Sequence, residues 1–272
     1  MKNHCKIIAE IGWNHMGNMK LAKKMIKEAK KSGADFAKFQ TWSTKTLKSG
    51  PWNKDGRLEI YKKAELSKKQ HIELIKFCKS CKITFLTSVF NQKDVDWLKK
   101  LNLKFIKIPS PEIHNIDLLK AVDGNFDTII ASTGTATWNE VKKVKKTIKK
   151  SKLVLLHCVS AYPANLENIN LPRIKKLKKI NKRIGYSGHL IGVNDAIAAL
   201  NYNPEFIEKH FTVDNKLPGR DNKFALLPEE LKYLVDYKNS LSLMNTFKGK
   251  NFQKVELDMR KNYRGRWLRK NN

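Results

Sequence analysis

Eight short apolar segments recur along the chain at nearly even spacing, and this repetition limits the folds that the chain can adopt. Stretches with helical periodicity separate them. Hydrophobic runs without strict alternation are typical of parallel strands covered on both faces, and strands that alternate with helices predict an α/β fold. A (β/α)8 barrel of the TIM type needs about 250 residues, which fits this chain of 272. The predicted strands are KIIAEIG (6–12), DFAKFQ (35–40), ITFLTSV (83–89), FIKIPS (105–110), DTIIASTG (127–134), LVLLHCV (153–159), RIGYSGH (183–189) and FIEKHFT (206–212).

The predicted helices carry start and stop signals of their own. Apolar side chains recur on one face of residues 21–33, and Gly33 stands where a helix C-cap belongs. Ser67 is a candidate N-cap for the helix that precedes the third strand. Residues 41–66, after the second strand, form the one long irregular segment. Because long loops in compact domains are usually functional, we expect this segment to lie over the barrel mouth.

The domain organisation follows from this pattern. We expect residues 1–245 to form one barrel and residues 246–272 to form a basic, peripheral C-terminal tail with no further folded domain. The N-terminus enters a strand almost directly, unlike a signal peptide. No stretch approaches the roughly 18 apolar residues of a membrane span. The sequence therefore predicts a cytoplasmic protein without a membrane partner.

The net charge of +30 raises the hypothesis of nucleic-acid binding. However, only eight of the 55 basic residues are arginine, whereas nucleic-acid readers favour arginine for bidentate contacts. The lysines are spread along the whole chain, without interleaved aromatic residues that could stack on bases. We therefore expect the lysines to cover the outer helices, and we do not expect specific nucleic-acid binding.

Each predicted strand ends in residues that can take part in chemistry. A parallel barrel brings all its strand ends to one mouth. A carboxylate, two lysines, several hydroxyls and two histidines should therefore meet in one place, which suits an anionic phosphate substrate and a divalent metal. These residues are Glu10, Lys38, Ser88, Lys107, Ser110, Ser132, His189, Glu208 and His210.

Two of these residues are lysines inside apolar strands. Burying Lys38 or Lys107 is costly without an anionic partner, so the pair indicates a bound anion. A Schiff-base lysine is the alternative interpretation. Glu10 is a candidate base or water-holding carboxylate, or else a structural partner of Lys38.

The two histidines end neighbouring strands. His189 and His210, with Glu208 and Asp221 close in sequence, form a candidate divalent-metal site. Two imidazoles with otherwise oxygen ligands suit Mn²⁺ or a similar ion better than structural zinc. The alternative is that both are hydrogen-bonded residues without a catalytic role. His157 is expected to be structural.

Taken together, several strings resemble the sialic acid synthase family, which includes N-acetylneuraminate synthase and its relatives that make legionaminic and pseudaminic acids. The resemblance covers roughly residues 5–240. It implies a (β/α)8 barrel that condenses phosphoenolpyruvate with an N-acetylated aldose, typically N-acetylmannosamine, and releases phosphate. It also implies a divalent metal that acts as a Lewis acid, with Mn²⁺ favoured over Mg²⁺ or Co²⁺. The strings are IAEIGWNHMGN, AKFQTW, FIKIPSPEI, ASTG, LHCVSAYP, GYSGH, IEKHFT and PGRDNKFALLPEEL.

The resemblance also assigns roles to single residues. Glu10 matches the glutamate that handles the proton or water, and His189 and His210 match the metal ligands. Glu208 is expected beside the metal and the sugar. The implied phosphoenolpyruvate pocket is Lys38, Ser88, Lys107, Ser110, Ser132 and Ser187. The implied sugar contacts are Glu112, Tyr162 and Asp221.

The chain departs from the family pattern at three places. Ser160 and Asn222 replace an expected asparagine and an expected histidine. The antifreeze-like domain that many members carry is not expected after the barrel. In those members it reaches across a dimer, so a homodimer is allowed here but its domain-swapped form is not supported. Two alternatives stay open: a different acceptor sugar, or a barrel that binds a ligand or partner without turnover.

Overall fold

A closed barrel of eight parallel strands, paired in sequence order from β1 to β8, forms the centre of the computed structural model, which describes residues 5–267. The (β/α)8 prediction is confirmed, and each predicted strand boundary lies within two residues of the observed one. The strands are β1 Lys6–Gly12, β2 Phe36–Thr41, β3 Thr84–Val89, β4 Phe105–Ile108, β5 Thr128–Ser132, β6 Lys152–Cys158, β7 Ile184–Gly188 and β8 Phe206–His210.

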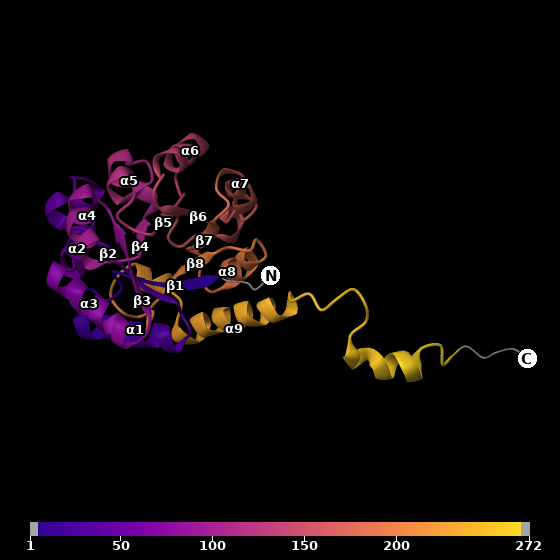
Figure 1. Cartoon of the computed structure of the whole chain (residues 1–272). Helices are drawn as coiled ribbons and strands as arrows, with labels where there is room; N and C mark the ends of the chain where they lie inside the picture. Colours follow the sequence, from indigo (N-terminus) through magenta and orange to yellow (C-terminus); the bar gives the residue numbers. More distant parts are fainter. Residues whose placement is uncertain (1–4, 268–272) are drawn as a thin grey trace, which may run out of the picture.

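Helices alternate with the strands and surround the barrel (Figure 1). The expected signals are in place: Gly33 follows α1 with a φ of +90°, and Ser67 closes a capping box on α3. The α-helices are α1 Met19–Lys31, α2 Arg57–Ala64, α3 Lys68–Ser80, α4 Gln92–Leu98, α5 Ile116–Val122, α6 Trp138–Thr147, α7 Arg173–Ile180, α8 Asn194–Leu200 and α9 Pro228–Met244.

The apolar core has two layers. The larger one packs the helices against the outside of the strands. The smaller one fills the barrel interior, where inward side chains from several strands meet. The barrel is therefore closed at this level, and a site can lie only above it, toward the carboxyl ends of the strands. The inner layer consists of Ile8, Phe36, Leu86, Ile130, Val154, Leu156 and Phe206.

The segment 41–66 is more regular than the sequence indicated. It contains two short 3₁₀ turns and helix α2, so the prediction of a wholly irregular segment was wrong. Gly56 is the N-cap residue that precedes α2 and has a φ of +82°, a conformation that glycine adopts at low cost. Tyr61 of α2 stacks on Trp13 at 5.0 Å, which holds this segment against the turn after β1.

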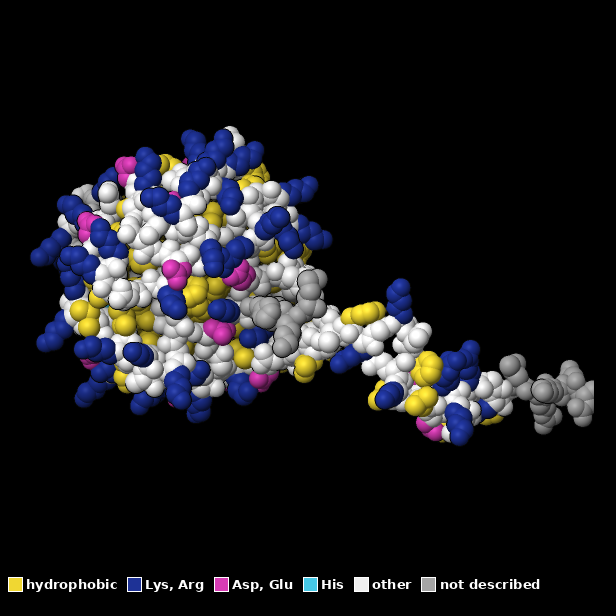
Figure 2. All heavy atoms as spheres, viewed as in Figure 1, with side chains coloured by type: hydrophobic (Ala, Val, Ile, Leu, Met, Phe, Trp, Pro, Cys, Tyr) yellow, Lys and Arg dark blue, Asp and Glu magenta, His cyan; other side chains and the backbone are white. Residues whose placement is uncertain are grey.

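Lysine and arginine side chains are spread over the visible surface of the barrel (Figure 2), as expected from their distribution along the chain. Beyond α9, residues 246–267 lead away from the barrel and are exposed to solvent (Figure 1). Among the described residues, no helix is long and apolar enough to cross a membrane.

Candidate active site

Side chains alternate between the two faces of a strand, so every second residue points into the barrel. This alternation places a polar layer directly above the inner apolar layer, which is called the apolar plug below. Ile8 of the plug is followed two residues later by Glu10, and Phe36 by Lys38. The same step leads from Phe206 to Glu208. It also leads from Leu86 to Ser88, from Phe105 to Lys107 and from Ile130 to Ser132. These polar side chains therefore face one another inside the barrel, and their arrangement follows from strand alternation.

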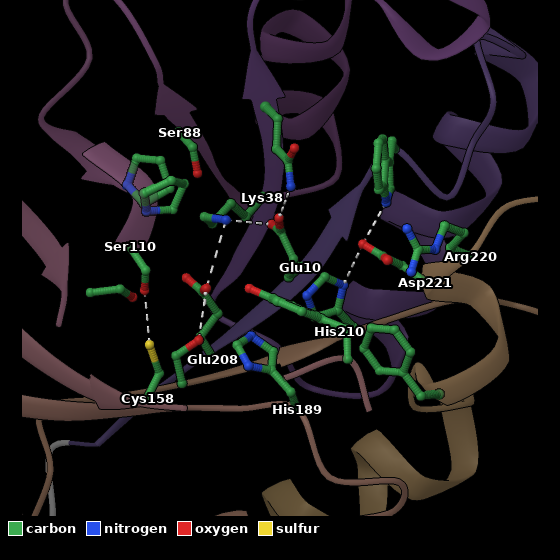
Figure 3. Close-up of a pocket in the computed structure, with 18 of the residues that line it drawn as sticks. Glu10, Lys38, Ser88, Ser110, Cys158, His189, Glu208, His210, Arg220 and Asp221 are labelled. Carbon is green, nitrogen blue, oxygen red and sulfur yellow. Dashed lines mark hydrogen bonds and ion pairs between the residues drawn. The ribbon is translucent and has the colours of Figure 1, made fainter. Parts of the chain in front are cut away.

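Two lysines and two glutamates form a buried ionic cluster in this layer, and Figure 3 shows Lys38 between Glu10 and Glu208. Lys38 Nζ lies 2.7 Å from Glu10 Oε2 and 3.7 Å from Glu208 Oε1. Lys107 Nζ lies 3.3 Å from the same Glu208 oxygen. Ser187 Oγ donates to Glu208 at 3.1 Å, and Gln40 Nε2 donates to Glu10 at 2.8 Å. Each lysine thus has a carboxylate partner within the chain, so its burial alone does not demand a bound anion.

The cluster drives the pKa values of its two carboxyl groups apart. Burial raises the pKa of Glu10, helped by the charge of Glu208 and opposed by Lys38. Burial acts upward on Glu208 too, but the ammonium groups of Lys107 and Lys38 outweigh it and lower the pKa of Glu208 to about 2. Glu208 is therefore a permanent anion, whereas Glu10 is the carboxyl group that can exchange a proton.

Serine hydroxyl groups line the same cavity, and two of them are unpaired. The buried Oγ atoms of Ser88 and Ser132 have no hydrogen-bond partner among residues 5–267. Ser110 Oγ lies 3.0 Å from Cys158 Sγ and accepts from the Gly134 amide at 3.2 Å. Unpaired buried hydroxyls are costly unless a ligand satisfies them, so these serines indicate a polar ligand above the ionic cluster.

His189 and His210 lie side by side at the ends of β7 and β8, with ring centroids 5.5 Å apart (Figure 3). His189 Nδ1 is 2.6 Å from the Val159 carbonyl oxygen. A carbonyl oxygen only accepts, so Nδ1 carries the proton and Nε2 is the basic nitrogen. Burial lowers the pKa of His189 to about 4 and that of His210 well below its ordinary value. Both rings are therefore neutral, the form that binds metals.

These two imidazoles fit half of a metal site. His189 has the orientation typical of metal ligands, with one ring nitrogen donating to a backbone carbonyl and the other free. His210 Nδ1 has no hydrogen-bond partner in the described part of the chain and lies 3.5 Å from Asp221 Oδ2. Within residues 5–267, no three His, Cys, Asp or Glu side chains form a preassembled metal site. A metal held here would take its remaining ligands from water or substrate.

Asp221 lies at the edge of the histidine pair. Burial raises its pKa to about 7, although the indole N–H of Trp13 donates to Asp221 Oδ2 and opposes the shift. The ring of Tyr162 packs 4.2 Å from the His189 ring. Asp221 and the ring of Tyr162 therefore border the imidazoles, and Trp13 holds the Asp221 carboxyl group.

One cavity of about 570 Å³ joins the ionic cluster, the serines and the histidines. All of the residues predicted for the site line it except Glu112. The Glu112 side chain instead accepts a hydrogen bond from Asn115 Nδ2 at 3.0 Å, just before α5. His157, expected to be structural, donates from Nε2 to the Ile169 carbonyl oxygen, 2.8 Å away, and is not a lining residue.

Comparison with known proteins decides the family. The NeuB family model matches residues 25–250. The chain belongs to the NeuB family. The resemblance seen in the sequence is thereby confirmed.

Relatives and solved structures agree with this NeuB assignment. The chain is 41% identical to the N,N'-diacetyllegionaminic acid synthase of Campylobacter jejuni over 245 residues, 84% of this chain and 73% of the relative. It is 37% identical to the enzyme of the same name from Legionella pneumophila, covering 85% of this chain and 70% of the relative. The structure of the N-acetylneuraminic acid synthetase of Leptospira borgpetersenii superposes with a TM-score of 0.85 at 33% identity, covering 98% and 93% of the two chains.

Several lining residues of this NeuB barrel were not predicted. Gln40 could have been found, because it follows Lys38 by one strand period. Arg57 and Tyr61 reach the cavity from α2, whose position over the mouth was expected only for the segment as a whole. Arg220 and Cys158 carried no signal in the sequence, because their positions depend on the folding of a loop and on the packing of β6.

Proposed function

We propose that this protein condenses phosphoenolpyruvate with an N-acetylated aldose, forming a nine-carbon 2-keto sugar acid and inorganic phosphate. The observation that carries the proposal is one cavity in which two lysines and unpaired serines adjoin two neutral imidazoles. The first group suits a small polyanion, and the second suits the carbonyl end of a sugar. Relatives named as synthases of sialic-acid-type sugars support this division.

The lysine side is proposed to bind phosphoenolpyruvate. Lys38 and Lys107 would attract its phosphate and carboxylate, and the hydroxyls of Ser88 and Ser132 would gain the partners that they lack. Ser110 and Ser187 lie in the same lining and are assigned to this pocket.

The proposed reaction forms one carbon–carbon bond between the two substrates and exchanges the phosphate oxygen on C2 for the oxygen of water. C3 of phosphoenolpyruvate bonds to the aldehyde carbon, whose oxygen takes up a proton and becomes a hydroxyl. Water adds to C2 and loses one proton, which leaves a hydroxyl on C2. The bond from C2 to the phosphate oxygen then breaks, phosphate leaves with the bonding electrons, and the C2 hydroxyl loses its proton and becomes the keto group. Glu10 is proposed to receive the proton of that water, because its pKa is raised by burial, whereas Glu208 stays ionised between the lysines.

The histidine side is proposed to hold a divalent ion, with Mn²⁺ favoured over Mg²⁺ or Co²⁺. His189 and His210 would be its protein ligands, each neutral and each with a ring nitrogen available. Such an ion, when bound, would supply Lewis-acid polarisation of a sugar aldehyde. Tyr162 and Asp221 are proposed to contact the sugar, and Glu208 to lie beside both subsites.

We infer that the preferred acceptor carries two acetamido groups. This choice is supported by the relatives at 41% and 37% identity, which are both named N,N'-diacetyllegionaminic acid synthases. The neuraminic acid synthetase structure is 33% identical. N-acetylmannosamine is the second candidate acceptor.

Phosphate release tests these proposals. The protein is incubated with phosphoenolpyruvate, Mn²⁺ and a panel of mono- and diacetamido aldoses, and the product mass is measured. We expect phosphate only when an acceptor is present, with the diacetamido sugars fastest. Binding of phosphoenolpyruvate without phosphate release from any sugar would favour a non-catalytic barrel. Lys107→Ala is the internal check, because it should weaken phosphoenolpyruvate binding far more than sugar binding.

A homodimer and cytoplasmic residence stay predictions. Sedimentation equilibrium would determine the number of chains in the assembly, and fractionation of the source cells would locate the protein.

A further inference from the structure

A second buried ion pair lies on the other side of the barrel wall, behind the histidines. Lys209 stands between Glu208 and His210 on β8, so strand alternation turns its side chain outward, toward α8. Its Nζ lies 2.9 and 3.2 Å from the two carboxylate oxygens of Asp195. Lys209 is 1% and Asp195 3% exposed. Neither lines the cavity, and the proposed reaction uses neither.

The third N–H of the Lys209 ammonium group donates to the backbone of the loop that follows His189. Lys209 Nζ donates to the Leu190 carbonyl at 2.6 Å, so all three of its hydrogens have acceptors. Leu190 directly follows His189. Asp195 is fixed in turn, because it accepts from the Tyr186 hydroxyl at 2.9 Å and from the Ala196 amide at 2.8 Å. The pair therefore connects β8, β7 and the start of α8 to the Leu190–Ile191 peptide group, one residue beyond His189.

Gly188 shows how closely this pair approaches the backbone. A Cβ atom at that position would lie 2.1 Å from Asp195 Oδ2 and 2.8 Å from Tyr186. Gly188 is also the residue paired with Lys209 across the two strands. A side chain here would displace the carboxylate, so the glycine just before His189 makes room for it.

Stability alone is a poor reason for such a pair. Buried ion pairs lose much of their attraction to desolvation, and well-packed apolar residues often replace them without cost. What an apolar pair cannot do is hold the Leu190 carbonyl. His189 is otherwise held by its own Nδ1 at Val159 and by the Ala164 amide, which donates to its carbonyl at 3.0 Å.

We propose that the Lys209–Asp195 pair is a positioning device that fixes the Leu190–Ile191 peptide group, one residue beyond His189, and thereby the direction of the His189 imidazole beside His210. Its importance for turnover rests on the proposed function, whereas its effect on the ring does not. Lys209 and Asp195 are positioning residues, since they act through His189.

The test uses Lys209→Met and the double variant Lys209→Met/Asp195→Leu, which replaces the pair by apolar side chains. Nitrogen-15 NMR of the imidazoles reports the His189 tautomer without any ligand, and titration reports Mn²⁺ affinity. We expect wild type to show the Nδ1–H tautomer alone and both variants to show mixed tautomers. We also expect a loss of Mn²⁺ affinity on the order of tenfold, as for other residues that orient metal ligands. The double variant avoids leaving one buried charge without its partner, although the Tyr186 hydroxyl and the Leu190 carbonyl lose theirs. The tautomer is therefore measured at a temperature at which the variant is shown to be folded.

The matched control is a pair at the opposite end of the same two strands. Arg183 precedes β7 and pairs with Glu205, which precedes β8, through its Nε at 2.7 Å. Arg183→Met/Glu205→Leu should leave the His189 tautomer and the Mn²⁺ affinity unchanged. A folded double variant at Lys209 and Asp195 with the wild-type tautomer would overturn the proposal. If wild type binds no Mn²⁺, the metal part of the proposed function fails, and the tautomer result still decides this inference.

Discussion

Replacing Glu208 by glutamine removes the one carboxylate that both buried lysines share. Glu208 Oε1 lies 3.3 Å from Lys107 Nζ and 3.7 Å from Lys38 Nζ. Lys38 keeps its closer partner, Glu10, at 2.7 Å. Glu208 is the carboxylate partner of Lys107 in the cluster, so Glu208→Gln leaves that ammonium group buried and uncompensated.

The expected cost can be bounded from these distances. At an effective dielectric constant of about 20, unit charges 3.3 Å apart attract by about 5 kcal/mol. The net loss of stability is smaller than this lost attraction, because the variant no longer has the desolvation cost of the buried Glu208 carboxylate. Removal of one partner from a buried pair costs about 3–5 kcal/mol, and we expect the lower end. For a domain of this size the melting temperature should fall by roughly 10 °C.

The loss of stability caused by Glu208→Gln should become smaller as the pH rises. Burial already lowers the pKa of Lys107, although Glu208 acts against that shift. Without Glu208 the pKa falls further, so the unfolded chain binds more protons than the folded one. The free energy of unfolding of the variant should therefore rise with pH up to the ordinary lysine pKa of about 10.4, and its deficit against wild type should shrink.

Chemical denaturation with and without phosphoenolpyruvate tests this reasoning. Phosphoenolpyruvate, which is proposed to bring negative charge to Lys107, should raise the free energy of unfolding of Glu208→Gln more than that of wild type. The control is Glu73→Gln, which breaks an exposed 2.6 Å pair with Lys23 and should cost less than about 1 kcal/mol. The reasoning is refuted if Glu208→Gln unfolds like the control and gains no extra stabilisation from phosphoenolpyruvate.

Three further predictions concern other parts of the molecule. Glu10→Gln should retain phosphoenolpyruvate binding but lose turnover by at least about a hundredfold; calorimetry and phosphate release check this, and turnover near wild type would remove Glu10 from proton transfer. His210→Ala should abolish Mn²⁺-dependent phosphate release, whereas equal wild-type rates in EDTA and in Mn²⁺ would contradict a metal role. Asp123 accepts backbone N–H bonds from residues 149–151, which outweigh burial and lower its pKa. Asp123→Asn should cost about 1 kcal/mol at neutral pH, and urea titrations should show this difference disappearing as the pH falls through the lowered pKa, because the stabilisation exists only while the carboxylate is ionised.

Much of the fold and site could be predicted because both depend on short-range periodicity. The strand period places Glu10, Lys38 and Glu208 one step above Ile8, Phe36 and Phe206, so the polar layer follows from the order of residues in each strand. Parallel closure then brings all strand ends to one mouth. Sequence reasoning was weaker where the backbone leaves the strands: segment 41–66 was expected to be irregular but contains α2, and Glu112 lies outside the cavity.

The amino-acid sequence by itself determined the barrel, the family and the chemical types gathered at the strand ends, because period, composition and motif are all local properties. Only the tertiary structure decided which charges are partners. It pairs Lys107 with Glu208 across 101 positions of sequence, and thereby separates the pKa values of Glu10 and Glu208. It also places Lys209 and Asp195 behind His189. Electrostatic energies depend on distance and burial in space, and neither is encoded in the local pattern.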